Sequence, residues 1–215
     1  MARLKLAVLV SGRGSNLQAL IDACAVPDYP AEIVLVMANV AGTGGIERAV
    51  RAGIPTQVVD HKAYPGREAF DAALSDSIAA SGADLVCLAG FMRLLTDGFC
   101  QRWRDRLINI HPSLLPAFKG LHTHERVLEA GVRITGCTVH FVRPAMDEGP
   151  IIAQAAVPVG PADDAETLAA RVLEQEHRLY TLAVRLIAEG RVTVRGERAE
   201  IAHAAPPRGS LINPA

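Results

Sequence analysis

The sequence has none of the features that direct a chain into a membrane or onto a polyanion. Its apolar runs, at residues 4–10, 33–38 and 85–89, are far shorter than a membrane span, and no signal-peptide pattern opens the chain. The 22 basic and 23 acidic residues nearly cancel, which leaves no electrostatic footprint for nucleic acid or an acidic membrane surface. We therefore expect a cytoplasmic protein with no nucleic-acid and no membrane partner.

The four cysteines lack the spacing of a metal site or a disulfide framework. Cys24, Cys87, Cys100 and Cys137 lie far apart and include no C-x-x-C pair. A thiolate zinc site would need closer spacing, and a disulfide framework would need an oxidising compartment. The sequence therefore predicts small buried apolar side chains at these positions and no metal.

What the chain does contain is an alternation of short apolar runs with helix-length segments. Half of the residues are hydrophobic, which is enough for a sizeable core. The runs of Val, Ile and Leu are uninterrupted, which indicates strands covered on both faces, as in a parallel sheet. Four strand-then-helix units are predicted, at 4–10 and 16–24, 33–39 and 45–52, 56–59 and 67–81, and 85–89 and 96–103. The pattern predicts an α/β fold with a doubly wound, mostly parallel sheet and a mononucleotide-binding, Rossmann-like N-terminal half.

The pattern changes after about residue 104. Strands are predicted at 107–109, 135–142 and 151–157, followed by one long amphipathic helix from 164 to about 189. Asp163 and Glu166 have the spacing of a capping box at the start of that helix, and a terminal hairpin is expected around Gly196. We predict one domain over residues 1–203, whose half from about 105 continues the sheet begun by residues 1–104, and a loose tail at 204–215.

A glycine-rich turn, SGRGSN at residues 11–16, follows the first predicted strand. Helix N-termini offer free N–H groups and a positive dipole end, and glycines let an anion approach the backbone. Leu17 and Asn39 stand where a dinucleotide fingerprint needs a small residue and an acid, and the Walker lysine is missing. The turn therefore predicts a site for one phosphate, with the Ser15 hydroxyl and the Asn16 amide as extra donors. The alternative is a tight turn in which Ser15 or Asn16 only caps the helix.

An asparagine and a histidine lie two residues apart at the exit of the fifth predicted strand. Asn109 and His111 would point to the same side, at the sheet edge where ligands of α/β proteins gather. An amide donor beside an imidazole suits an acyl transfer that passes through a tetrahedral oxyanion. Asp147, in a later loop, would favour the imidazolium if it approached His111. The alternatives are that His111 is a turn residue before a proline and that Asp147 is a solvated loop acid.

Five segments of the chain occur in the order typical of one enzyme family. They are SGRGSN, AGFMRLL from Ala89, NIHPSLLPAFKGLHTH from Asn109, GCTVHFV from Gly136 and DEGPII from Asp147. Over roughly residues 6–191 they closely resemble the glycinamide ribonucleotide formyltransferase family. The resemblance implies transfer of the formyl group of 10-formyltetrahydrofolate, as co-substrate, to the amine of 5-phosphoribosylglycinamide in de novo purine biosynthesis. It implies no metal.

The resemblance also implies roles for individual residues. Asn109, His111 and Asp147 match the family's catalytic trio. Gly14, Ser15 and Asn16 match its substrate-phosphate loop, and Glu176 matches an acid that hydrogen-bonds the glycinamide substrate. The residues that match the formyl-folate site are Arg67, Met92, Arg93, Leu94, Leu95 and again Asn109. On this basis the half from about 1 to 104 would bind phosphate, and the half from about 105 to 203 would carry catalysis and folate binding.

Four other functions remain as alternatives. A methionyl-tRNA formyltransferase would need clustered Lys and Arg for its polyanion, and a formyl-folate hydrolase would carry an extra N-terminal module, for which we expect no room before residue 4. A metal-dependent hydrolase could use His111, His122, His124 and His140, with His122 and His124 on one face of an extended segment. A non-catalytic mononucleotide-binding module would explain the glycine turn alone. A homodimer is left open.

Overall fold

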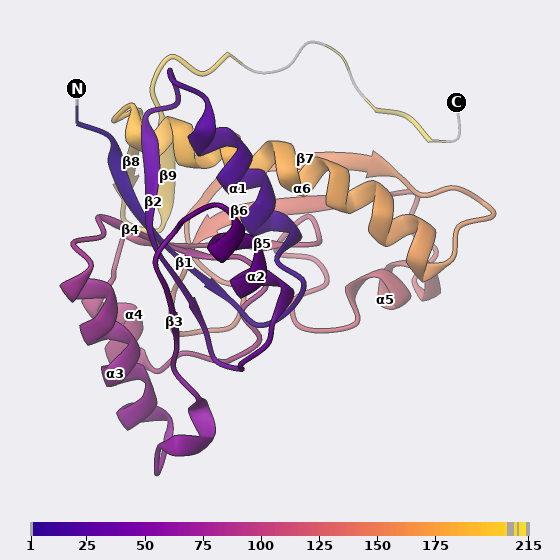
Figure 1. Ribbon diagram of the computed structural model, residues 1–215. Helices are drawn as coiled ribbons and strands as arrows, with labels where there is room; N and C mark the ends of the chain where they lie inside the picture. The colour runs from indigo at the N-terminus through magenta and orange to yellow at the C-terminus, as the bar shows by residue number, and fades with distance from the viewer. Residues whose placement is uncertain (1, 206–208, 210, 214–215) are drawn as a thin grey trace.

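The central strands of the sheet are covered on both faces, whereas the edge strands β3 and β7 are partly exposed. The computed structural model describes residues 2–205, 209 and 211–213. One seven-stranded sheet has the order β3-β2-β1-β4-β5-β6-β7, parallel from β3 to β5 and antiparallel from β5 to β7 (Figure 1). Its strands are β1 Leu4–Val10, β2 Ala31–Ala38, β3 Thr56–Val58, β4 Leu85–Leu88, β5 Leu107–His111, β6 Ile134–Phe141 and β7 Ile151–Pro158. The predicted fold class, doubly wound and mostly parallel, is confirmed.

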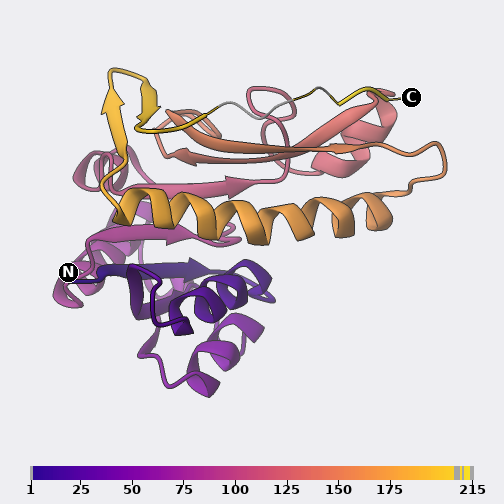
Figure 2. The same ribbon diagram turned by 90° about the horizontal axis from the view of Figure 1, so that it is seen from above.

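Helices cover both faces of the sheet. They are α1 Ser15–Ala25, α2 Gly44–Arg51, the 3-10 turn η1 His61–Ala63, α3 Arg67–Ala80, α4 Asp97–Arg102, α5 Thr123–Glu129 and α6 Ala165–Ala188. Side chains of β1 alternate between two cores: Leu6 and Val8 pack with α1 and α6, whereas Ala7 and Leu9 pack with α3 and α4. Figure 2 shows α6 running along the boundary between the two halves of the chain, so this helix joins them.

The order of the strands creates a topological switch point at the carboxyl end of β1, the place where open α/β sheets form a ligand crevice. The chain moves from β1 outward through β2 and β3, and then returns to pair β4 with the other side of β1. Ligands of open α/β sheets bind at such a switch point. The turn after β1 and the segment after β4 meet there, since the Ser11 N–H donates to Gly90 O at 3.0 Å.

The predicted ends of α1 to α4 differ from the structure by at most one residue, and two further expectations for helices are wrong. The capping box of α6 is formed by Asp164 and Thr167, one residue later than predicted, because Asp163 instead binds Arg171. Helix α5 was not predicted: its N-cap His122 is left-handed, with φ 54°, and makes no side-chain cap. The extended segment expected for His122 and His124 is therefore wrong, because His124 lies inside this helix.

The ends of the predicted domain are partly described. The expected hairpin forms, with β8 Val192–Arg195 paired to β9 Arg198–Ile201. In the predicted tail, Asn213 Nδ2 donates to Arg133 O at 2.6 Å, and residues 206–208, 210 and 214–215 lie outside the described residues. Cys87, Cys100 and Cys137 are buried and Cys24 is half-buried, all as free thiols. Within the described part of the chain, no helix is both long and apolar enough to cross a membrane.

The close pairing of β6 with β7 gives a stability prediction. A Cβ added at Gly136 would lie 1.8 Å from Ala155 O, a backbone atom that cannot move aside. Gly136→Ala is expected to destabilise the protein by about 2–3 kcal/mol, which lowers the melting temperature by roughly 4–12 °C. Gly98→Ala is the matched control, because a Cβ there meets nothing within 4 Å. Equal melting temperatures for the two variants would contradict this prediction.

Candidate active site

The glycine turn presents the N-terminus of α1 without any side-chain cap. Gly14 is the N-cap residue, with φ 72° and ψ 34°, and neither Ser15 nor Asn16 caps the helix. A Cβ on Gly14 would lie 2.6 Å from the Cα of Gly45, because the turn packs against the start of α2. Gly45 N–H also donates to Gly12 O at 3.0 Å. The turn thus needs glycine, and its shape suits an anion at the helix N-terminus.

The second side of this turn is formed by α6. Asn16 Nδ2 donates to Glu176 Oε2 at 2.8 Å, and both side chains are buried. Burial raises the pKa of Glu176 above the ordinary glutamate value, and the hydrogen bond from Asn16 partly offsets this effect. One N–H of the Asn16 amide is thus engaged by Glu176, and the predicted use of this amide as a phosphate donor rests on its second N–H. Packing of α1 on α6 brings the two residues together across 160 positions.

Asn109 is held by a histidine on the neighbouring strand. Its Nδ2 lies 3.4 Å from His140 Nε2, and the two residues are directly paired across β5 and β6. His140 Nδ1 lies 3.0 Å from Phe141 O and must carry the proton, so Nε2 is the acceptor. Burial lowers the pKa of His140, which favours this neutral form. His140 therefore fixes which end of the Asn109 amide is the donor.

His111 lies between two acceptors. Its Nδ1 is 3.4 Å from Asp147 Oδ2, and its Nε2 is 3.0 Å from Phe118 O. Gly120 N–H donates to the same carboxylate oxygen at 2.7 Å. The His111 and Asp147 side chains are only 6% and 12% exposed. Only an imidazolium can donate to both acceptors, so the surroundings suit a charged His111.

The segment after β4 is open to solvent. Met92 and Leu94 are 70% and 59% exposed, while Arg93 and Leu95 are half-buried. Ser11 joins this segment to the glycine turn, because its Oγ accepts from Met92 N–H at 2.8 Å and donates to Asn39 Oδ1 at 2.6 Å. Exposed apolar side chains next to a crevice are suited to cover the apolar rings of a ligand.

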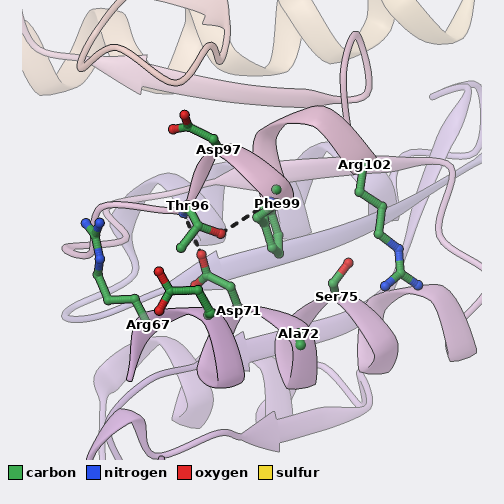
Figure 3. Close-up of a pocket in the computed structure, with 10 residues that line it drawn as sticks. Arg67, Asp71, Ala72, Ser75, Thr96, Asp97, Phe99 and Arg102 are labelled. Atoms are coloured by element: carbon green, nitrogen blue, oxygen red, sulfur yellow. Dashed lines mark hydrogen bonds between the residues drawn. The ribbon is translucent and has the colours of Figure 1, made fainter. Parts of the chain in front are cut away.

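Arg67 lies apart from these groups. It lines a cavity of about 580 Å³ between α3 and α4, with Arg102 at the opposite end and Asp71 between them (Figure 3). Asp71 Oδ2 accepts from Thr96 N–H at 2.6 Å. No hydrogen bond or ion pair joins Arg67 to the other predicted site residues in the part of the chain that the structure describes.

The histidines of the metal-hydrolase alternative do not assemble. Across residues 2–205, 209 and 211–213, no three His, Cys, Asp or Glu side chains cluster closely enough to hold a metal ion. His122 is largely exposed beside Glu125, and His140 faces Asn109. The acid–base groups that do come together are His111 and Asp147.

Sequence reasoning missed four groups that shape the site. Ser11 had been treated only as part of the turn, His140 only as a candidate metal ligand, and the Phe118 carbonyl and the Gly120 N–H not at all. The sequence carries no usable signal for the His140 contact, because the pairing of His140 with Asn109 depends on the register of β5 against β6.

A topological switch point, an uncapped helix N-terminus, an oriented amide and a buried His–Asp pair are together typical of α/β enzymes that transfer a group. Residues 4–184 match the family described as formyl transferase, and the chain belongs to this family. It is 44% identical over 207 residues to the phosphoribosylglycinamide formyltransferase of Escherichia coli, covering 96% of this chain and 98% of that one.

Other relatives agree in fold and differ in length. Glycinamide ribonucleotide transformylase 1 from Symbiobacterium toebii has a TM-score of 0.91 and 50% identity, covering 93% of this chain and 94% of that chain. The trifunctional purine biosynthetic protein adenosine-3 of Gallus gallus is 53% identical over 199 residues, covering 93% of this chain and 20% of that protein. The chain thus spans about a fifth of the length of the trifunctional relatives.

The buried Glu176 makes stability depend on pH in a defined direction. Because its pKa is raised in the folded state, its contribution to stability is complete below the ordinary glutamate pKa and is lost as pH rises through the folded pKa. Glu176→Gln is expected to reduce the fall in melting temperature over this range. Glu174→Gln, at an exposed position of the same helix, should leave the wild-type pH dependence unchanged. The same dependence of melting temperature on pH in wild type, Glu176→Gln and Glu174→Gln would contradict the raised pKa of Glu176.

Proposed function

We propose that the chain transfers the formyl group of 10-formyltetrahydrofolate to the amine of 5-phosphoribosylglycinamide in de novo purine biosynthesis. The observation that carries the proposal is the buried contact of His111 with Asp147 beside the oriented Asn109 amide. Membership of the formyl transferase family supports the reaction type, and the matched bacterial relatives support the acceptor. We place the enzyme in the cytoplasm, where both substrates are dissolved, and a homodimer stays an alternative.

The acceptor fits the side of the crevice formed by α1. Its phosphate would bind the backbone N–H groups of Gly14, Ser15 and Asn16, at the uncapped start of the helix, together with the Ser15 hydroxyl. Glu176 would hydrogen-bond the rest of the ribotide, held in place by the Asn16 side chain. In this arrangement the acceptor amine would point toward the carboxyl ends of β4 and β5.

The donor fits the other side of the crevice. The exposed Met92 and Leu94 would cover the pterin ring, and the backbone of residues 92–95 would pair with its polar edge. Arg67, at the start of α3, would bind the carboxylate end of the folate. The folate is a co-substrate that leaves as tetrahydrofolate.

The chemistry is a direct attack of the amine on the formyl carbon. A C–N bond forms and the carbonyl oxygen becomes an oxyanion, which accepts hydrogen bonds from the Asn109 amide and from His111 Nε2–H, in exchange for Phe118 O. Asp147 stabilises the imidazolium throughout. When the tetrahedral intermediate collapses, the bond to N10 of the folate breaks, N10 takes up a proton, and the acceptor nitrogen loses one to solvent. Nothing covalent forms on the protein.

The glycine turn predicts a strong preference for the phosphorylated acceptor. The ribotide should exceed its dephosphorylated riboside by about 1,000-fold in kcat/KM, since two charge-assisted hydrogen bonds of about 2 kcal/mol each give this factor. Steady-state kinetics with both acceptors measures the ratio. Ser15→Ala should lower kcat/KM for the ribotide and leave that for the riboside unchanged. Similar turnover of ribotide and riboside by the wild type would mean that the turn binds no phosphate.

The Asp147 carboxylate predicts a shift in the pH profile. In Asp147→Asn the imidazolium loses its carboxylate, so the basic limb of the kcat profile should move to lower pH. The acidic limb, set by loss of the proton from the acceptor amine, should stay. Turnover at neutral pH should fall by about 100- to 10,000-fold with little change in substrate binding. Near-normal turnover would make Asp147 a plain loop acid, and a shift of the acidic limb would make His111 a general base.

A further inference from the structure

The C-terminal hairpin touches the loop that carries Asp147 through one buried arginine. Arg143 follows β6 and its side chain is only 8% exposed. Its Nε donates to Glu197 Oε2 at 2.8 Å, and its Nη2 donates to Asp105 Oδ1 at 2.7 Å. Glu197 lies in the turn between β8 and β9, and Asp105 lies just before β5. Three segments distant in sequence therefore meet at this guanidinium.

Arg143 also begins the loop of residues 143–148, which carries Asp147. Its N–H donates to Glu148 O at 3.2 Å, which closes the loop one residue after Asp147. A Cβ on Gly149 would lie 3.0 Å from Arg143 Cγ and 2.0 Å from Phe141 O, so the arginine stem packs directly on the returning backbone. A displacement of the Arg143 side chain would therefore disturb the point at which the loop closes.

The backbone conformation of Asp147 needs support from its surroundings. Its φ is 53°, a left-handed conformation that costs free energy for any residue with a Cβ and persists only when the surroundings enforce it. On the far side, Gly120 N–H holds the carboxylate and Lys119 binds Glu148 at 2.6 Å. On the near side, the Arg143 N–H closes the loop through its bond to Glu148 O.

The charges around the Arg143 guanidinium are balanced. Arg104 Nη2 binds Glu197 Oε1 at 2.8 Å, so two arginines face the two carboxylates of Asp105 and Glu197. The hydrogen bond from Arg143 is the largest cause that lowers the pKa of Glu197, followed in the same direction by Arg104. Removing the Glu197 charge would leave the buried guanidinium with one carboxylate, a change that a buried charge tolerates poorly.

We propose that Arg143 and Glu197 are positioning residues. Through them the C-terminal hairpin fixes the start of the loop of residues 143–148 and so holds Asp147 against His111. Neither residue touches the reacting atoms. The inference rests on the proposed function for its kinetic consequence, but its structural consequence, the placement of Asp147, is independent of which reaction is catalysed.

The test compares two substitutions in the same hairpin. Glu197→Gln removes the carboxylate charge that binds Arg143, whereas Glu200→Gln removes only an exposed ion pair with Arg195 and serves as control. Glu197→Gln is expected to lower kcat by about 3- to 10-fold and to move the basic limb of its pH profile to lower pH, with each KM little changed. Glu200→Gln should behave as wild type, and Glu197→Asp should recover part of the loss.

An NMR titration of the His111 imidazole separates this inference from the proposed function. Asp147, His124 and His140 are the titratable groups that act on or are affected by His111, and only Asp147 is carried by the loop of residues 143–148. In Glu197→Gln the midpoint should move to lower pH even without substrate, and in Glu200→Gln it should not. A lower melting temperature with an unchanged His111 titration and pH profile would show a purely structural role and overturn the proposal.

Discussion

The contact between Asp147 and His111 is the constraint on which the site depends. Both side chains are nearly enclosed, and an unpaired charge in such surroundings would be costly. The carboxylate removes that cost for an imidazolium, provided that it stays within reach. Its loop achieves this in a strained backbone conformation, held by Gly120 on one side and by Arg143 on the other. The geometry of the site therefore depends on the loop that holds Asp147 in place.

The sheet brings the rest of the machinery to that contact. The reversal of strand order at β1 places the uncapped start of α1 beside the segment after β4, and the pairing of β5 with β6 sets Asn109 against His140. Ser11 connects the glycine turn to the segment after β4, because its Oγ accepts from Met92 N–H and its N–H donates to Gly90 O. Each half of the chain thus contributes groups that would be incomplete alone, which explains why α6 packs across both.

Local patterns predicted most of the fold, and contacts between distant residues account for what was missed. Uninterrupted apolar runs located the central strands β1, β2 and β4, because burial on both faces leaves that signature. Helix α5 was not predicted, because it is short and its N-cap is a left-handed histidine. The Asn16–Glu176 bond could not be foreseen, since it depends on how α1 packs on α6, and the pairing of Asn109 with His140 depends on strand register. Arg143 gave no signal, because its partners lie 38 and 54 residues away.

The fate of the formyl carbon in a single turnover is the most direct test of the account. Enzyme in excess is mixed with ¹³C-formyl-labelled 10-formyltetrahydrofolate and the ribotide, and the products are identified by mass spectrometry and NMR. The account predicts that the label passes quantitatively to the ribotide nitrogen, in step with the release of tetrahydrofolate and without residence on the protein. Label recovered as formate, or bound covalently to the chain, would contradict it.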